Sequence, residues 1–147
     1  MTSNGQMEIQ NLVEKLLAKH NIDPAQDFHL KLSNIPYLDL VLERYGHNTI
    51  LVGHYFVQNG DLMGDPILAM EDISGYWSPL YIEQWNNYML RETICAFHKD
   101  GKLTLYPDRM KNFRSFQRRF TRRLKTQGWL EYGVVKDIPW CLPIPTN

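Results

Sequence analysis

An alternation of apolar and polar side chains in the middle of the chain constrains the fold more than any other feature of the sequence. Three leucines alternate there with their neighbours: Leu38, Leu40 and Leu42 with Asp39, Val41 and Glu43. A period of two predicts a strand with one buried face. Residues 49–58 are rich in β-branched and aromatic side chains and predict a central strand, and residues 67–71 predict a third. Consecutive strands of this kind form an antiparallel meander.

Turn-forming residues separate the predicted strands. Asp100-Gly101 predicts a tight hairpin turn, because such turns need residues that tolerate a positive φ. Residues 59–66, where Asn, Gly, Asp and Pro gather, predict a loop, and residues 72–79 predict an irregular segment. Further strands are expected at 28–32, 80–85, 88–97 and 102–106. The sequence therefore predicts an antiparallel sheet of about five to six strands, centred on residues 37–106.

Two helices flank the predicted sheet. Residues 4–20 place apolar side chains at helical spacing, with Ser3 or Asn4 as the cap. Residues 108–127 form a basic helix with Asp108 as its cap and Gly128 just beyond its end. Its apolar face consists of Met110, Phe113, Phe116, Phe120 and Leu124.

The order of these elements predicts a single α+β domain over residues 1–147, with both helices on one face of the sheet. The other face is expected to stay partly open, which is common for antiparallel sheets and suits binding. The Pro- and Trp-containing tail, residues 129–147, is expected to lie over the body, anchored by Trp129 and Trp140.

Composition excludes several classes of protein. The 147 residues suit one domain, and no stretch approaches the roughly 20 apolar residues of a membrane span. Cys95 and Cys141 share no metal-binding spacing and are expected to be reduced thiols. The first residues lack the pattern of a signal peptide, and no cofactor fingerprint is present. We therefore expect a cytoplasmic protein without a cofactor or a membrane partner, and the sequence leaves its oligomeric state open.

The distribution of charge is uneven. Residues 109–125 hold eight Lys and Arg and no acid, in a chain whose net charge is zero. Five of these side chains share the helix face away from the apolar residues and are called here the arginine stripe: Lys111, Arg114, Arg118, Arg122 and Lys125. The stripe either pairs with acidic residues of the same chain or binds a polyanion, such as nucleic acid or an acidic protein. Arginine suits phosphate groups well.

Two further groups of residues are candidate sites. His54, Asp61 and Asp65 could form a divalent-metal or hydrolytic site, although their spacing is not that of an EF-hand. The alternative is that the two aspartates shape a turn and that His54 is a hydrogen-bonded core residue. Trp77, Tyr81 and Trp85 could form a binding surface, since aromatic residues favour protein interfaces and stack on unpaired bases. Their alternative role is packing within the domain.

One segment resembles a known family. The run His54-Tyr55, two residues, Gln58–Met63, one residue and then Asp65-Pro66 is similar to the signature of an uncharacterised bacterial domain family that recurs in phages, plasmids and integrative elements. The resemblance extends from Tyr37 to Trp129. Val57 and the proline-rich tail depart from the pattern. The family has no assigned activity, so the resemblance implies no catalytic residue. It implies an accessory protein of mobile DNA.

Three functions remain open from the sequence. The first is a non-enzymatic binding protein that contacts nucleic acid or a protein complex, one version of which inhibits a host defence nuclease. The second is a small metal-dependent hydrolase or nuclease that uses His54, Asp61 and Asp65. The third is a structural subunit of a larger assembly.

Overall fold

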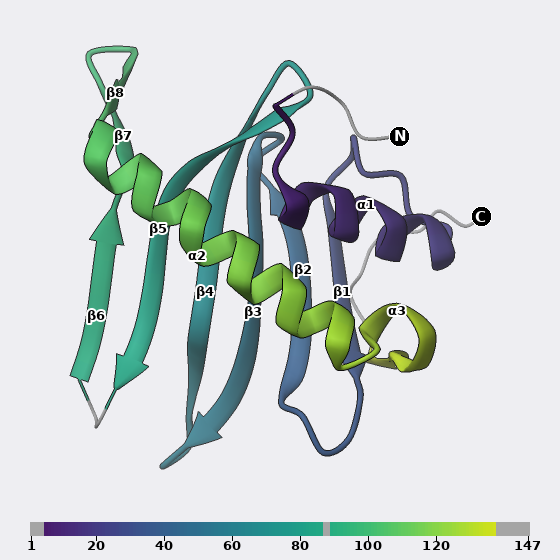
Figure 1. The fold of residues 1–147 in the computed structure, drawn as a ribbon. Helices are drawn as coiled ribbons and strands as arrows, with labels where there is room; N and C mark the ends of the chain where they lie inside the picture. Colours follow the sequence, from purple (N-terminus) through teal and green to yellow (C-terminus); the bar gives the residue numbers. More distant parts are fainter. Residues whose placement is uncertain (1–4, 87–88, 138–147) are drawn as a thin grey trace.

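A seven-stranded antiparallel sheet carries three helices on one face (Figure 1). The computed structural model describes residues 5–86 and 89–137. The strand order is β6-β5-β4-β3-β2-β1-β9, so six strands follow one another as a meander and the last strand joins at the edge. The strands are β1 Phe28–Ser33, β2 Asp39–Tyr45, β3 Thr49–Gln58, β4 Asp61–Ile73, β5 Tyr76–Asn86, β6 Met89–Ile94 and β9 Val134–Asp137. A separate hairpin consists of β7 Ala96–Lys99 and β8 Lys102–Leu105.

The core lies between the helices and one face of the sheet. The helices are α1 Glu8–Lys19, α2 Pro107–Thr126 and the short α3 Trp129–Tyr132. α2 crosses the strands diagonally, and α1 lies beside it (Figure 1). Alternate sheet residues are fully buried beneath the helices: Leu40, Leu42, Ile50, Val52, Leu68 and Met70. Their period of two is the alternation seen in the sequence, and it confirms the α+β class with an antiparallel sheet.

The sheet has more strands than predicted, because β9 from the tail joins its edge, and two segments expected to be irregular instead lengthen β4 and β5. Asn59 and Gly60 alone make the turn between β3 and β4, with φ values of 53° and 85°. This is the two-residue hairpin geometry that Asn-Gly favours. The predicted loop over 59–66 is therefore wrong, since pairing resumes at Asp61. Ser74 and Gly75 make the next turn in the same way, so residues 72–79 are mostly strand.

The ends of the chain also differ from the expectation. α1 begins at Glu8 and not at residue 4, and residues 1–4, including the expected caps, lie outside the described residues. α2 begins at Pro107, so Asp108 lies in its first turn and does not cap it. Gly128 does adopt the left-handed conformation expected after the helix, with φ 78°.

The tail was not predicted to contain regular structure. Trp129 is fully buried, and Val134–Asp137 pairs with β1 as an edge strand. Trp140 and Cys141 lie outside the described residues, whereas Cys95 is buried, and this burial raises the pKa of its thiol to about 11.

Two buried glutamines fasten α1 to the rest of the fold. The side-chain oxygen of Gln117 on α2 accepts a hydrogen bond from the Ile9 backbone N–H at 2.9 Å, and its amide donates to Glu8 at 2.7 Å. Gln117 therefore satisfies one of the free N–H groups at the start of α1, which has no cap of its own. Gln10 accepts from the Trp77 backbone N–H at 2.9 Å and donates to the Gly75 carbonyl at 2.7 Å. Both glutamines are almost fully buried.

Replacement of Gln117 by leucine should destabilise the domain by about 1–3 kcal/mol, because the buried Ile9 N–H then has no acceptor. Urea denaturation measures the change. Gln26→Leu is the matched control, since Gln26 is exposed and its loss should change the free energy of unfolding by less than about 0.5 kcal/mol. Equal effects of the two substitutions would contradict this role of Gln117.

Candidate functional site

The arginine stripe lies on the exposed side of α2. All five of its residues are exposed, while Met110, Phe113, Phe120 and Leu124 on the opposite side are buried. Within the described residues, the stripe makes one ion pair, between Arg118 Nε and Glu8 Oε2 at 3.2 Å. Arg118 is 53% exposed and Glu8 43% exposed, and an ion pair between such exposed groups typically contributes about 0–1 kcal/mol. Internal pairing with the acidic part of the chain therefore accounts for little of this charge.

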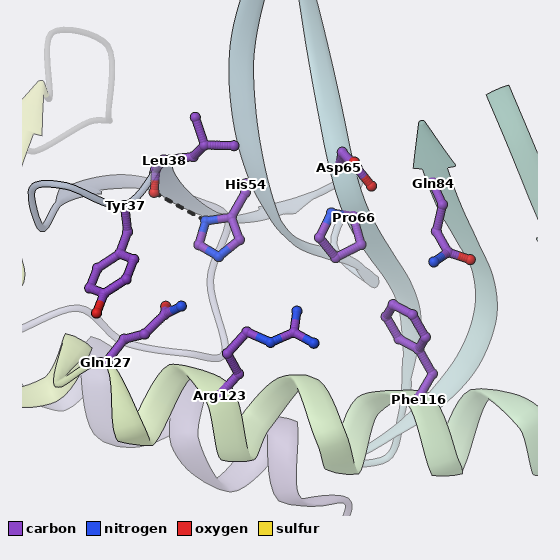
Figure 2. A pocket seen from close by; sticks show the side chains of 9 residues that line it. All are labelled: Tyr37, Leu38, His54, Asp65, Pro66, Gln84, Phe116, Arg123 and Gln127. Atoms are coloured by element: carbon purple, nitrogen blue, oxygen red, sulfur yellow. Dashed lines mark hydrogen bonds between the residues drawn. The ribbon is translucent and has the colours of Figure 1, made fainter. Parts of the chain in front are cut away.

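A pocket of about 380 Å³ lies on another flank of α2, between this helix and residues of β3, β4 and β5 (Figure 2). Its lining residues are Tyr37, Leu38, His54, Asp65, Pro66, Gln84, Phe116, Arg123 and Gln127. Phe116 and Arg123 lie on α2 and Gln127 is its C-cap residue, and their spacings of seven and four residues place them on one flank of the helix. The sequence carries no local signal for this pocket beyond the helical spacing of Phe116 and Arg123.

His54 forms part of the wall of this pocket. Its Nδ1 lies 3.1 Å from the Leu38 carbonyl oxygen (Figure 2). The ring packs edge-on against Phe120, with centroids 5.6 Å apart, and lies 5.7 Å from Trp129. Because a carbonyl only accepts hydrogen bonds, Nδ1 carries the proton. His54 is therefore the hydrogen-bonded, buried histidine that was one of the two interpretations of the sequence.

Burial lowers the pKa of His54, and the nearby charge of Arg123 acts in the same direction. The Asp39 and Leu38 carbonyls and the Asp65 carboxylate oppose this shift. The ring is therefore neutral at pH 7, which leaves Nε2 with a free lone pair. At this pH His54 offers a hydrogen-bond acceptor on the side of the ring that faces away from Leu38.

The proposed metal or hydrolytic group is only partly brought together. His54 and Asp65 both line the pocket. Asp61 pairs with Gln58 at the far end of the β3–β4 hairpin. His54 lies four residues before Gln58 on β3, which is about 13 Å along the strand. Among the described side chains, no group of three or more His, Cys, Asp or Glu could hold a metal ion.

The three aromatic candidates lie on different faces of the sheet. Trp77 is 2% exposed and belongs to the core under the helices, which is the packing role given above as its alternative. Tyr81 and Trp85 are half-buried and lie on the open face, since Ile82 between them belongs to the helix-side core. The sequence could not separate Trp77 from the other two, because a bulge between β4 and β5 shifts the register near Ala69 and Met70.

Acidic and aromatic side chains meet on this open face. Glu83 on β5 lies directly opposite Glu92 on β6. Tyr81, two residues before Glu83 on the same strand, lies opposite Ile94. Burial raises the pKa of Glu83, and its hydrogen bond with Glu92 and the charge of Glu92 raise it further. Burial also raises the pKa of Tyr81 to about 12, with a contribution from Glu83. The open face therefore brings two acidic side chains together, whereas the helix face carries the arginine stripe.

Comparison with known proteins identifies a family for this chain but assigns no activity to it. A family model described as a domain of unknown function (DUF6908) matches residues 8–130. The chain belongs to this family. No curated protein matches the sequence, and no solved structure matches it. The region matched by the DUF6908 model runs from the first residue of α1 into α3, so it includes the arginine stripe and every residue that lines the pocket.

None of the helices in the described part of this DUF6908 domain is long and apolar enough to cross a membrane.

The shifted pKa of His54 predicts a pH-dependent loss of stability. Below the ordinary histidine pKa of about 6.5, the unfolded chain takes up a proton that the folded ring resists. The free energy of unfolding should therefore fall with pH from about 6.5 down to the folded pKa, by at most about 1.4 kcal/mol per pH unit. Urea denaturation at pH 7.5, 6.5 and 5.5 measures the fall, which should be smaller in His54→Gln.

His20 is the control for this measurement, because burial also lowers its pKa. A His20→Asn variant should retain the part of the pH dependence that belongs to His54. Parallel pH profiles for the wild type and His54→Gln would show that His54 titrates alike in both states.

Proposed function

We propose that this DUF6908 domain is a non-enzymatic binding protein that contacts nucleic acid through the arginine stripe of α2. One observation carries the proposal. Within residues 5–86 and 89–137, four of the five stripe residues make no ion pair with a carboxylate of their own chain: Lys111, Arg114, Arg122 and Lys125. Exposed cations that the fold does not neutralise are available to an external anion.

The dimensions of the stripe suit a phosphate backbone. Lys111 and Lys125 are 14 residues apart, which is about 21 Å along the helix axis. Duplex DNA carries one charge per about 1.7 Å of its axis, so about a dozen phosphates pass along such a length. Residues 109–125 carry a charge of +8, from eight Lys and Arg. The rest of the chain carries −8, because it holds the other 8 of the 16 Lys and Arg and all 16 acids. A net charge of zero therefore conceals one strongly basic surface.

The resemblance noted in the sequence supplies a setting for this activity. An accessory protein of mobile DNA works where nucleic acid and the enzymes that process it are present. Contact with phosphate groups through α2 suits such a role, and it requires neither a bound metal nor a catalytic residue.

Replacement of Arg114 and Arg122 by alanine tests the proposal. The wild type should bind labelled nucleic acid at low salt, and its affinity should fall as the salt concentration rises. The double variant should bind more weakly and should reduce the slope of log affinity against log salt by about 2 for duplex DNA, since two phosphate contacts are lost. Fluorescence anisotropy over a salt series measures both quantities.

Lys99→Ala with Lys102→Ala is the matched control, because these exposed lysines of the β7–β8 hairpin remove the same charge away from the stripe. The control should keep most of the affinity and the salt slope. The absence of binding at low salt, or an equal loss in both double variants, would refute the role of the stripe.

A second candidate function is protein binding through the open sheet face. The facing pair Glu83 and Glu92, with Tyr81 and Trp85 beside it, is the observation that favours it. Carboxylates beside aromatic rings attract arginine and lysine side chains, through ion pairs and cation–π contacts. A carboxylate surface of this kind could also occupy the nucleic-acid groove of a defence nuclease.

An oligoarginine peptide tests this second candidate. A labelled peptide should bind the wild type in a salt-dependent manner and bind Glu83→Gln/Glu92→Gln several-fold more weakly, because the variant removes both charges. Asp108→Asn/Glu131→Gln removes two exposed charges at helix positions and should leave the affinity nearly unchanged. Equal affinity for all three proteins would reject the open face as a site for cationic partners.

A further inference from the structure

The pocket beside α2 has the size and position of a site for a small planar group. Its volume of about 380 Å³ falls within the range of small-molecule sites. It opens on the flank of the helix that also carries Arg123 (Figure 2). Neither the family match nor the proposed function gives it a ligand.

Several polar groups in this pocket have no partner within the described part of the chain. Asp65, Gln84 and Arg123 line it, and their side chains make no hydrogen bond or ion pair there. Gln127 uses its side-chain oxygen to accept from Trp129 Nε1 at 2.9 Å. The neutral ring of His54 adds an acceptor at Nε2. A ligand would therefore meet donors on Arg123 and acceptors on Asp65 and His54.

Apolar and aromatic surfaces complete the lining. Tyr37 and Phe116 lie at opposite ends of the group of lining residues, with Pro66 between them and above the helix (Figure 2). Tyr37 is 41% exposed, so its ring is accessible from outside. Flat apolar surfaces combined with a few hydrogen-bonding groups are what unpaired bases meet in proteins that bind single strands.

A continuous path of positive charge connects the arginine stripe to this pocket. At 3.6 residues per turn, Arg119 lies about 60° from Arg122 and about 40° from Arg123 around the axis of α2. All three side chains are exposed. A nucleic-acid backbone held by the stripe can therefore cross the helix at Arg119 and bring a base to the pocket at Arg123.

We propose that the pocket accepts one unpaired base of a single-stranded nucleic acid whose phosphates lie on the arginine stripe. This inference rests on the proposed function. Carboxylates accept from the exocyclic amine of cytosine, and arginine donates to the ring nitrogen and carbonyl oxygen of guanine. With both groups present, the pocket matches bases that carry an amine and a carbonyl, as cytosine and guanine do. Thymine and uracil have no exocyclic amine, so they can offer Asp65 only the single N3–H of the ring.

Oligo(dC) and oligo(dT) of 15 nucleotides test the base contact with ring size and charge held constant. The wild type should bind oligo(dC) about tenfold more tightly than oligo(dT), as one well-placed pair of hydrogen bonds predicts. Asp65→Asn should remove this preference and leave the affinity for duplex DNA unchanged. Asp100→Asn, in the exposed turn of the β7–β8 hairpin, removes the same charge and should behave as the wild type. Melting temperatures check that both variants are folded.

The same experiment separates failure of the pocket from failure of the stripe. If Arg114→Ala/Arg122→Ala weakens both oligonucleotides while Asp65→Asn changes neither, the stripe stands and the pocket proposal is overturned. A second measurement does not depend on the stripe: titration with cytidine monophosphate should shift the imidazole NMR signals of His54, and uridine monophosphate should shift them less. Unchanged His54 signals at millimolar cytidine monophosphate would overturn the pocket proposal even if the stripe binds DNA.

Discussion

The packing of α2 across the sheet is the contact on which the rest of the structure depends. Phe113, Phe120 and Leu124 are buried there, and Gln117 ties the same helix to the start of α1. A helix that buries one side against a sheet must turn its other side towards solvent. Because residues 109–125 contain no acid, all the charged side chains of that segment are basic. When the apolar face of α2 packs against the sheet, the arginine stripe is therefore exposed to solvent.

His54 links the same contact to the pocket. Its ring lies against Phe120 of α2 and against Trp129 just beyond that helix, while the Leu38 carbonyl fixes its orientation. The histidine is thus held by both layers of the fold. A rigid wall of this kind lowers the entropic cost of binding, because little has to be ordered when a ligand arrives. Sites built on strands and helices hold such geometry better than sites built on loops.

Much of the fold and the arginine stripe could be predicted from local patterns, but the pocket could not. The period of two identified the buried leucines of β2, and helical spacing identified both the buried face of α2 and the exposed stripe. Asn59-Gly60 was read as the start of a long loop, although two residues complete the turn. Trp77 was grouped with Tyr81 and Trp85, because an alternation count cannot detect the bulge that separates their faces. The pocket joins residues from Tyr37 to Gln127, and no local pattern reports contacts over such a distance.

The pairing of β9 with β1 has a consequence for how the chain is made. Leu32 pairs with Val135, and Ile9 meets Gln117, so both contacts join residues more than a hundred positions apart. During synthesis from the N-terminus, β1 therefore has one unpaired edge until residues 134–137 have left the ribosome. Exposed strand edges can pair with other chains, and distant contacts slow folding. The nascent meander is thus a stage at which this domain can misassemble, and the pairing of β9 with β1 ends that stage.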